Sequence, residues 1–361
     1  MRIYLSIAAS SDGFIDDCTP ERLRLSTPED WDEVCQLRAC FDAILVGAST
    51  VRNDDPSLRI KDSALRDRRM RQGMTADIAR ITITASGALP ADARFFTGEG
   101  RAIVITPNKR YSHPTAEVLH VDEITAESVV SVLERAGIGS LFVEGGAQTA
   151  RMFMEAGVVD TLRYAVNPQI KVGDPAAPHF DPAPWVADAA AVRRNPGGME
   201  VTVYELSGID FAADERFMRM AVEQSRRSEP SPTAYRVGAV VVTAGGGVYA
   251  GYTHESRPTS HAEQDAVAKA LAAGAELRGA AIYSSLEPCT SRRSEPESCS
   301  QLIVRYGFAR VVFAMFEPDC LALCDGVAHL RRSGIRVDVM PRFAADVRRI
   351  NAHICGESHE K

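Results

Sequence analysis

One histidine and two cysteines in the second half of the sequence have the residue types of a metal site. His261 opens an Ala-rich segment with helical periodicity, Cys289 follows a β-rich run, and Cys299 stands at the start of the next helical segment. Zinc binds neutral imidazole and thiolates in a tetrahedral set, and a catalytic zinc site leaves the fourth position to water. His261, Cys289 and Cys299 therefore predict one catalytic Zn²⁺ ion.

Glu263 follows the histidine at the spacing His-x-Glu, and a proline precedes Cys289. This combination is the signature of zinc nucleobase deaminases, in which the glutamate is not a ligand but transfers protons. Bound zinc lowers the pKa of its water, the hydroxide attacks an amidine-like ring carbon, and Glu263 delivers the proton that lets ammonia leave. The structural alternative is a capping box formed by Ser260 and Glu263, and we expect Glu263 to serve as both cap and acid/base.

Length and composition limit the classes of protein that fit. A chain of 361 residues exceeds the usual single core, so we expect two domains. A net charge of −7 with 7% aromatic residues argues against nucleic-acid binding or editing, which needs a basic face and stacking aromatics. Because no run approaches the ~18 apolar residues of a membrane span and no signal peptide is recognisable, we expect a cytoplasmic protein with no membrane or nucleic-acid partner.

The first part of the chain alternates β-rich runs with helical segments, which predicts an α/β domain with a largely parallel sheet. A Pro-Gly-Gly turn within 192–206 predicts a hairpin that closes this domain. We expect domains at 1–207 and 214–361, joined by a linker at 208–213. The strands predicted for the first domain are 2–10, 42–48, 80–86, 102–106 and 141–146, and the helices are 28–41 and 126–137.

The second part alternates strands with helices from about Phe217 to its end. The charged run 65–73 of the first part is predicted to be a solvated loop, with a phosphate contact as the alternative. The strands predicted for the second part are 236–242, 248–254, 280–286 and 310–316, and the helices are 261–274 and 300–307.

Two glycine turns in the first domain stand where a dinucleotide could bind. In VEGGAQTA, a strand ends and a helix begins near Ala147, so a pyrophosphate could approach backbone N–H groups at Gly145 and Gly146. In LVGASTVRNDDPSL, a second glycine turn is followed by Asp54 and Asp55. The structural alternative for this aspartate pair is a cap on a turn beside the following proline.

Residues 1–206 resemble the reductase of riboflavin biosynthesis through SIAASSDGFID, FDAILVGASTVRNDDPSL, LPADARFF, VEGGAQ and EAGVVDTLRYAVNP. The resemblance implies a dihydrofolate-reductase-like fold that uses NADPH. It implies that one aspartate of the Asp54-Asp55 pair and Glu144 hold the substrate, which Ser6 and Lys61 also contact, although bacterial enzymes commonly have lysine and arginine at these two places. The residues implied to line the dinucleotide are Gly47, Ser49, Thr50, Gly145 and Gly146.

From Asp214 onward the chain resembles the pyrimidine deaminases of riboflavin biosynthesis, through VGAVVV, GYTHES, HAE, LEPC and ARVVFAM. This resemblance implies a cytidine-deaminase-like, three-layer α/β/α domain, closer to the fungal than to the bacterial deaminase. The loop TSRRSEPESC replaces the bacterial SHHGRTPPC. Arg292 and Arg293 in this loop are expected to meet a ribityl phosphate through forked hydrogen bonds, with exposed surface arginines as the alternative.

Together the resemblances imply a bifunctional riboflavin-pathway enzyme with the reductase first and the deaminase second, the reverse of the familiar bacterial order. The expected product is 5-amino-6-ribitylaminouracil 5′-phosphate, made from a phosphorylated pyrimidine, with reduction before deamination. The family implies a homodimer. One alternative is a specialised-metabolism enzyme acting on a related pyrimidine or pteridine-like precursor, and another is that one domain is catalytically inactive and retained for binding or assembly.

Overall fold

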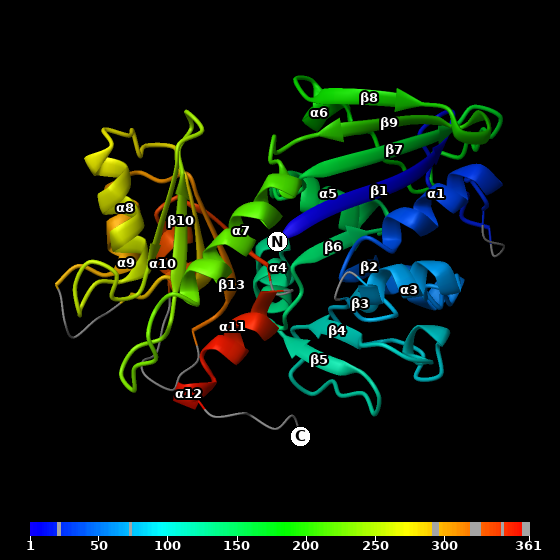
Figure 1. Cartoon of the computed structure of the whole chain (residues 1–361). Coiled ribbons are helices and arrows are strands. Elements are labelled where there is room, and N and C mark those ends of the chain that lie inside the picture. Colours follow the sequence, from blue (N-terminus) through cyan, green and yellow to red (C-terminus); the bar gives the residue numbers. More distant parts are fainter. Residues whose placement is uncertain (20–22, 72–73, 291–295, 318–325, 341–342, 356–361) are drawn as a thin grey trace. The chain divides into compact units, whose positions relative to one another are not determined.

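The computed structural model describes residues 1–19, 23–71, 74–290, 296–317, 326–340 and 343–355. The chain divides into two units, one of residues Arg2–Ile209 and one of residues Asp210–Lys361 together with Met1. Figure 1 labels their elements. None of the helices in the described part of the chain has the length and apolar character needed to cross a membrane.

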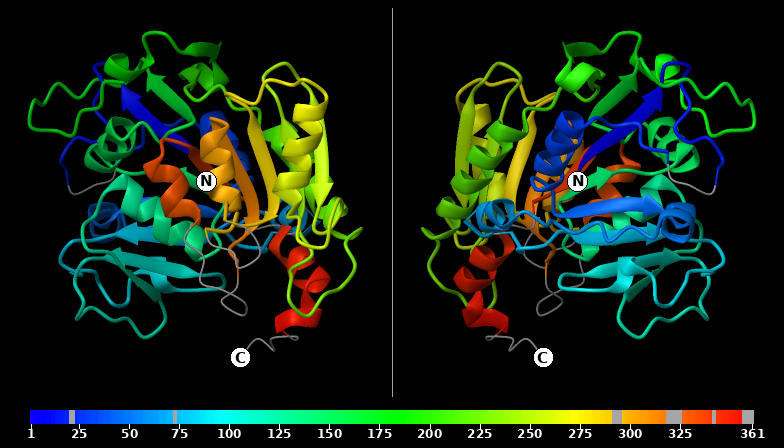
Figure 2. Two further views of the ribbon diagram at one scale, coloured as in Figure 1. Left: turned by 90° about the vertical axis from the view of Figure 1, so that its left-hand side faces the viewer. Right: turned by 90° about the vertical axis from the view of Figure 1, so that its right-hand side faces the viewer.

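The first unit is built on one sheet, which has nine strands in the described part of the chain, in the order β5-β4-β3-β2-β6-β1-β7-β9-β8. Every pairing from β5 to β7 is parallel, whereas β9 pairs antiparallel with both β7 and β8. Figure 2 shows this sheet from cyan β4 and β5 at one end to the green hairpin of β8 and β9 at the other. The strands are β1 (Arg2–Ser10), β2 (Ala43–Gly47), β3 (Ala79–Ile83), β4 (Ala102–Thr106), β5 (Glu117–His120), β6 (Ser140–Val143), β7 (Thr161–Asn167), β8 (Ala190–Arg194) and β9 (Glu200–Glu205).

Helices follow most of the parallel strands, as an α/β domain requires. Val34 of α1 packs in one core with Tyr4, Ile44 and Phe142. Tyr4 and Ile44 both pair in register with Phe142, so the three side chains lie on one face of the sheet. The α/β class with a largely parallel sheet is thus confirmed. The helices of this unit are α1 (Pro28–Arg38), α2 (Ala48–Asp54), α3 (Ser63–Arg71), α4 (Ala126–Arg135), α5 (Ala147–Glu155) and α6 (Ala183–Val186), with short 3₁₀ turns at Arg94–Phe96 and Pro196–Gly198.

The charged run 65–73 is not the solvated loop that its composition predicts, because its described residues up to Arg71 continue α3. Arg69 is fully buried. Its guanidinium donates to the backbone carbonyls of Ala39 at 3.1 Å and Phe41 at 2.5 Å, and its Nε donates to that of Thr75 at 2.9 Å. An arginine in this run therefore donates hydrogen bonds to backbone carbonyls, a role that the charge content alone does not indicate.

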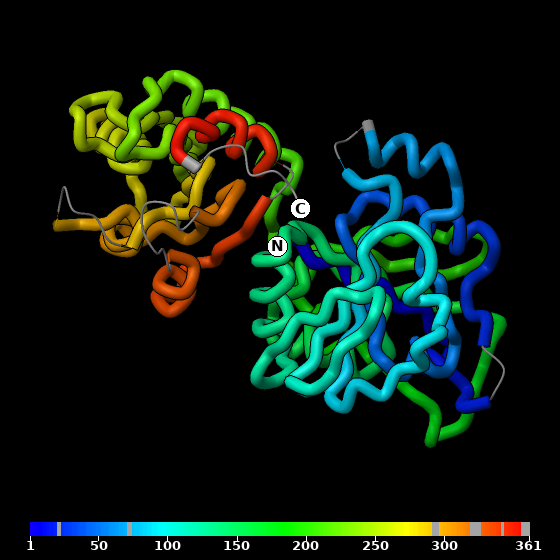
Figure 3. The backbone as a smooth tube through the Cα atoms, turned by 90° about the horizontal axis from the view of Figure 1, so that it is seen from below, coloured from blue at the N-terminus to red at the C-terminus, as the bar shows by residue number. Residues whose placement is uncertain are grey.

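The second unit has a sheet of five strands among its described residues, in the order β11-β10-β12-β13-β14. β10 pairs antiparallel with β11 and β12, and the remaining pairings are parallel. Its path from α7 to α11 can be followed in Figure 3. The elements are α7 (Phe211–Ser225), β10 (Gly238–Val242), β11 (Val248–Tyr252), α8 (Ala262–Ala272), β12 (Ala281–Leu286), α9 (Cys299–Arg305), β13 (Arg310–Met315), α10 (Gly326–Arg332), β14 (Arg336–Val339), α11 (Ala344–Ile350) and α12 (Ala352–Cys355).

Helices cover both faces of this second sheet. Residues of α7 and α11, such as Phe217 and Val347, pack on one face with Val240 of β10. Residues of α8, α9 and α10 pack on the opposite face with Ala239, the neighbour of Val240 in β10. In Figure 1, α7 and α8 accordingly lie on opposite sides of β10. The three-layer α/β/α arrangement expected from the sequence is confirmed.

Candidate functional site

His261, Cys289 and Cys299 come together at the ends of three elements of the second unit. His261 precedes the first residue of α8, Cys289 follows β12, and Cys299 is the first residue of α9. Nδ1 of His261 lies 3.7 Å from Sγ of Cys289 and 3.4 Å from Sγ of Cys299. Tetrahedral zinc with one nitrogen and two sulfur ligands separates the ligand atoms by about 3.5–3.8 Å. The three side chains therefore fit a zinc ion.

Glu263 lies beside the group of His261, Cys289 and Cys299, which we call the metal-ligand group. Its side chain contacts one of the sulfur atoms and the neighbouring strand β12. Its carboxylate accepts a hydrogen bond from Oγ of Ser284 at 2.9 Å and one from Sγ of Cys299 at 3.3 Å. The side chain is 3% exposed, and this burial raises its pKa, against the opposing effect of the His261 charge. A buried carboxyl group with a raised pKa can hold a proton and release it to a bound molecule.

The predicted capping box of Ser260 and Glu263 is wrong. The helix begins at Ala262, so His261 is its N-cap, and the His261 N–H donates to Oε1 of Gln264 at 3.1 Å. Glu263 is consequently in the first turn of α8, where its side chain turns to Ser284 and Cys299 instead of to the backbone. The side chain of Gln264 supplies the cap that was assigned to Glu263.

The two thiols differ in protonation. Hydrogen bonds from Cys299 and from His261 lower the pKa of the Cys289 thiol to about 4, against the effect of burial. The hydrogen bond to Cys289, together with burial, raises the pKa of Cys299. Cys289 also accepts from the backbone N–H of Cys299 at 3.4 Å, at the start of a helix where anions are stabilised. The lowered pKa of Cys289 favours the thiolate form, which is the form that binds a metal ion.

Sequence reasoning missed three side chains around this group. Ser284, which binds Glu263, is a fully buried polar residue inside the strand β12. Glu287 is 5% exposed and accepts from the Val327 N–H at 3.0 Å. Burial and the charge of Cys289 raise the pKa of Glu317 to about 8. The available signal was a polar residue in or just after each of two apolar strands.

Arg292 and Arg293, predicted to meet a phosphate, lie outside the described residues.

In the first unit, the two glycine turns lie at the ends of neighbouring parallel strands. Leu45 of β2 pairs with Val143 of β6, and the Glu144 N–H donates to the Leu45 carbonyl at 2.9 Å. Gly47 is the N-cap of α2 and Gly146 that of α5, so the amino ends of two helices begin at this edge. Such helix ends present N–H groups to an anion, and the phosphates of a dinucleotide are suitable ligands.

Thr149 of α5 lies against both turns. A Cβ added to Gly145 would be 2.5 Å from Cβ of Thr149, and one added to Gly47 would be 3.1 Å from its Oγ1. The Thr149 side chain is 7% exposed, so it has little room to withdraw. Glycine at these places lets the backbone of the two turns approach α5. Thr149 was not among the predicted site residues, although it lies in the quoted motif VEGGAQTA.

The residues after Gly47 are on or just beyond α2. Ser49 is exposed and Thr50 half-buried, and Oγ of Ser49 accepts from Arg52 at 3.1 Å. Asp54 ends the helix. Asp55 adopts a left-handed backbone (φ 41°), and its carboxylate accepts from the backbone N–H of Arg94 at 2.6 Å and from its Nε at 3.0 Å. Asp55 therefore links the end of α2 to the 3₁₀ turn Arg94–Phe96 by hydrogen bonds.

Glu144 forms a forked ion pair with Arg38 of α1, with Nε of Arg38 2.6 Å from Oε1 and Nη2 bonded to Oε2. The Arg38 guanidinium also lies 4.6 Å from the ring centroid of Trp31. Ser6 is buried at 8% exposure and pairs in register with Arg163 of β7. Lys61 is exposed between α2 and α3. The structure thus brings Ser6 and Glu144 to adjoining strands and leaves Lys61 on a surface segment.

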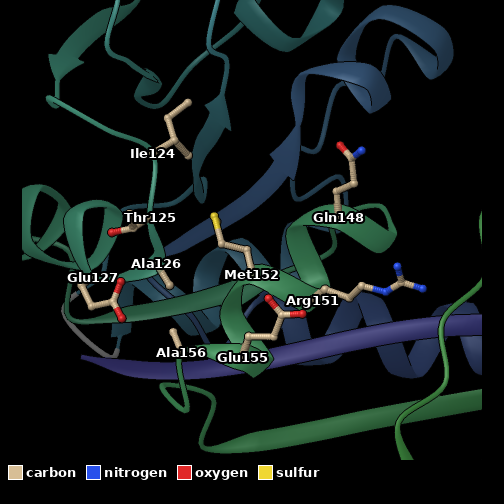
Figure 4. A pocket seen from close by; sticks show the side chains of 9 residues that line it. All are labelled: Ile124, Thr125, Ala126, Glu127, Gln148, Arg151, Met152, Glu155 and Ala156. Carbon is tan, nitrogen blue, oxygen red and sulfur yellow. The ribbon is translucent and has the colours of Figure 1, made fainter.

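A shallow hollow of about 460 Å³ lies elsewhere on the first unit, between the start of α4 and one face of α5. Figure 4 shows Met152 and Arg151 in it, with Glu127 and Glu155 nearby. The predicted site residues are not among those that line it. We therefore assign it no part in either candidate site.

Two family matches divide the chain in the same order as the two units. The family described as "RibD C-terminal domain" matches residues 2–189, in agreement with the dihydrofolate-reductase-like fold expected there. The family described as "Cytidine and deoxycytidylate deaminase zinc-binding region" matches residues 212–315. The second match includes His261, Glu263, Cys289 and Cys299.

Each of the curated relatives matches only part of the chain. A 2,5-diamino-6-ribosylamino-4(3H)-pyrimidinone 5′-phosphate reductase of Archaeoglobus fulgidus is 32% identical over 46% of this chain and 80% of its own length. A diaminohydroxyphosphoribosylamino-pyrimidine deaminase of Schizosaccharomyces pombe is 39% identical over 34% of this chain, which spans only 31% of that protein. A riboflavin biosynthesis protein RibD of Aquifex aeolicus is 40% identical over 35% of this chain and 34% of its own. A solved deaminase/reductase of Thermotoga maritima aligns at 21% identity with a TM-score of 0.48, over 57% of this chain and 56% of its own.

Proposed function

Because the chain belongs to the RibD C-terminal domain family and carries a deaminase zinc-binding region after it, we propose that it is a bifunctional enzyme of riboflavin biosynthesis. The first unit would reduce the ribosylamino side chain of a phosphorylated pyrimidine with NADPH. The second would replace a ring amino group by oxygen. The combined product would be 5-amino-6-ribitylaminouracil 5′-phosphate. From the resemblance we also propose a homodimer in the cytoplasm.

The deaminase half of the proposal rests on one observation, the 3.3 Å approach of the buried Glu263 carboxylate to Cys299 within the ligand group. His261, Cys289 and Cys299 would hold Zn²⁺, which when bound makes its water a nucleophile near neutral pH. Ser284 fixes one oxygen of Glu263. The other oxygen is left toward the ligand group, where it would take a proton from water and pass it to the leaving ammonia.

In the reductase half, the amino ends of α2 and α5 would hold the phosphates of NADPH at Gly47, Gly145 and Gly146. Ser49 and Thr50 would line the same cofactor. When bound, NADPH supplies the hydride, so the protein is needed to orient the two molecules and exclude water. Glu144, held by Arg38, and an aspartate of the Asp54-Asp55 pair would hold the substrate.

A second candidate keeps both chemistries but changes the substrate to a related pyrimidine or pteridine-like precursor of specialised metabolism. Two observations favour it. Ser6, one residue beyond the last β1–β6 pair of Leu5 with Val143, stands where bacterial enzymes commonly have lysine. Its partner in β7, Arg163, is ion-paired with Asp30 and Glu33. The loop between Cys289 and Cys299 also differs from the bacterial one. The complete deaminase residue set speaks against an inactive second domain.

A product assay on the purified, zinc-loaded chain tests the proposal. The diamino-ribosylamino-pyrimidinone phosphate is incubated with and without NADPH, and products are resolved by mass. We expect both reduction and ammonia loss with NADPH, and neither without it if reduction comes first, as the likeness to the fungal deaminase favours. Ammonia loss without NADPH would reverse that order. If neither change occurs in the zinc-loaded chain with NADPH, the riboflavin assignment fails and the specialised-metabolism candidate takes its place.

A further inference from the structure

Asp265 is a buried carboxylate of α8 that binds the loop in front of the metal-ligand group. Its side chain is 4% exposed. It accepts hydrogen bonds from Oγ of Ser260 at 2.6 Å, from Oγ of Ser256 at 2.5 Å and from the Ser256 N–H at 3.3 Å. All of these donors lie in the segment between β11 and α8. Ser260 immediately precedes His261.

The loop is also closed on itself. The His254 N–H donates to the Ser260 carbonyl at 2.9 Å, and His254 has a left-handed backbone (φ 65°). The Ser260 N–H donates to the Arg257 carbonyl at 3.0 Å, and Ser260 itself is fully buried. The Ser256 hydroxyl donates to Asp265, and the Ser260 hydroxyl lies 2.6 Å from Asp265 and 3.1 Å from the Arg257 carbonyl. The Asp265 carboxylate therefore joins the two serines of this turn to α8.

A second contact on α8 restrains the outer part of the same loop. Nζ of Lys269, one turn beyond Asp265, lies 2.6 Å from Oε1 of Glu255 and 2.7 Å from the Ala250 carbonyl. The Lys269 side chain is 46% exposed, so this ion pair contributes little to stability. Of the two α8 residues that contact this loop, Asp265 is buried and Lys269 is exposed, and Asp265 is the nearer to His261 in the sequence.

We propose that Asp265 is a positioning residue of the metal centre: by holding Ser256 and Ser260 it fixes the backbone entering His261, and so sets the ring where Cys289 and Cys299 can share an ion with it. This inference rests on the proposed function of the zinc site and adds a residue that does not touch the ion. Partners behind the ligands commonly change metal affinity by about 10- to 100-fold. We expect a change in Zn²⁺ affinity in the same range, because without the loop contacts the His261 imidazole is no longer held in its binding position before the ion binds.

The test measures Zn²⁺ affinity of the full chain by competition with a chromophoric chelator, and the absorption spectrum of the Co²⁺-substituted chain, which reports ligand geometry. Asp265→Ala should weaken Zn²⁺ binding by about 10- to 100-fold and broaden or shift the Co²⁺ bands. Asp265→Asn, which keeps one oxygen acceptor in the same shape, should restore most of the affinity. Wild-type affinity and an unchanged Co²⁺ spectrum in Asp265→Ala would overturn the proposal.

A matched control separates positioning from general stability. Asp214 is also a buried carboxylate of this unit, at 2% exposure, and accepts from the Tyr283 hydroxyl at 2.6 Å and from Arg310 at 2.7 Å, on the sheet face covered by α7. Asp214→Ala should lower the thermal midpoint and leave the Zn²⁺ affinity and Co²⁺ spectrum unchanged. A loss of affinity in Asp214→Ala equal to that in Asp265→Ala would show that Asp265 acts only through stability, which also overturns the proposal.

Two milder variants cover the case in which Asp265→Ala does not fold. Ser256→Ala and Ser260→Ala each remove a donor and keep the carboxylate, and each should weaken Zn²⁺ binding severalfold. Wild-type affinity in both would overturn the proposal. Because the measurement is metal binding, its failure is distinct from that of the proposed function: a wild-type chain that binds Zn²⁺ but releases no ammonia contradicts the function alone.

Discussion

A Cβ placed on Gly145 would lie 2.5 Å from Cβ of Thr149, whereas one placed on the adjacent Gly146 would meet nothing within 4 Å. Of the two glycines in this turn, only Gly145 is required to be glycine by packing within the protein. Gly145 is needed for a close approach to α5, and Gly146, at a φ of −61°, has an ordinary backbone and open space. A methyl group on Gly145 therefore tests how the packing of this turn on α5 supports the proposed cofactor site.

Gly145→Ala should weaken NADPH binding, because the added methyl group forces the turn away from Thr149 and moves the N–H groups that face the phosphates. Overpacking of this kind costs about 1–3 kcal/mol, so we expect the dissociation constant to rise about 5- to 150-fold. Quenching of protein fluorescence by NADPH measures it. NADPH affinity at the wild-type level in Gly145→Ala would remove Gly145 from the cofactor site.

Arg38→Met should impair the reductase because it leaves the Glu144 carboxylate, 18% exposed, without its forked partner. Breaking a buried pair costs about 3–5 kcal/mol, which the thermal midpoint of the reductase unit should report as a lower stability. Arg38→Lys keeps the charge but not the two parallel hydrogen bonds, so its reductase kcat/KM should be intermediate. Ammonia release by the second unit serves as the control. Unchanged stability and reductase kcat/KM in Arg38→Met would contradict the role given to this pair.

Cys289 of the metal-free chain should react with iodoacetamide at about pH 6, where ordinary thiols are protonated. The reason is its pKa, lowered to about 4 by hydrogen bonds from Cys299 and His261. The sign follows directly: the thiolate predominates above that pKa, so labelling should fall only as the pH drops through about 4. Peptide mass mapping measures the labelling, and added Zn²⁺ should suppress it. Labelling that instead rises with an ordinary thiol pKa would contradict the assignment.

Removal of zinc by a chelator should stop ammonia release and lower the thermal midpoint of the second unit, because a bound ion stabilises the folded state that holds its ligands. Reduction by the first unit should persist, since its candidate residues belong to another core. Readdition of Zn²⁺ should restore ammonia release. Ammonia release that survives complete metal removal, verified by elemental analysis, would exclude a metal-dependent deaminase.

The metal-ligand group was accessible to sequence reasoning because its members stand at the boundaries between elements. Strand ends and helix starts are recognisable from local patterns, and the motif spacing supplied the rest. Ser284, Thr149 and Asp265 were not accessible in the same way. Ser284 contacts Glu263 of α8, and Thr149 lies against Gly47 of another turn, so sheet register and helix packing set their contacts. Asp265 contacts two serines of the loop before α8, and the folding of that loop sets its contacts.

The errors in the fold have a similar origin. β7, which pairs with β1 near the centre of the sheet, was not among the predicted strands. Its third residue, Arg163, breaks the apolar pattern, yet it is 1% exposed because Asp30 of α1 pairs with it. The run 65–73 was assigned to a solvated loop for the same reason: a buried arginine, Arg69, is satisfied by carbonyls that only the folded chain brings near.

The most direct measurement of the central claim follows both half-reactions in one sample, comparing the wild-type chain with Glu263→Gln in the presence of Zn²⁺, NADPH and the diamino-ribosylamino-pyrimidinone phosphate. The variant keeps the shape of the side chain and its hydrogen bond from Ser284 but cannot carry the proton. We predict that it retains zinc and reduces the substrate at the wild-type rate while ammonia release is lost. Ammonia release at the wild-type rate, or loss of both reactions in a folded, zinc-loaded variant, would contradict two separate sites with Glu263 as the acid/base of one.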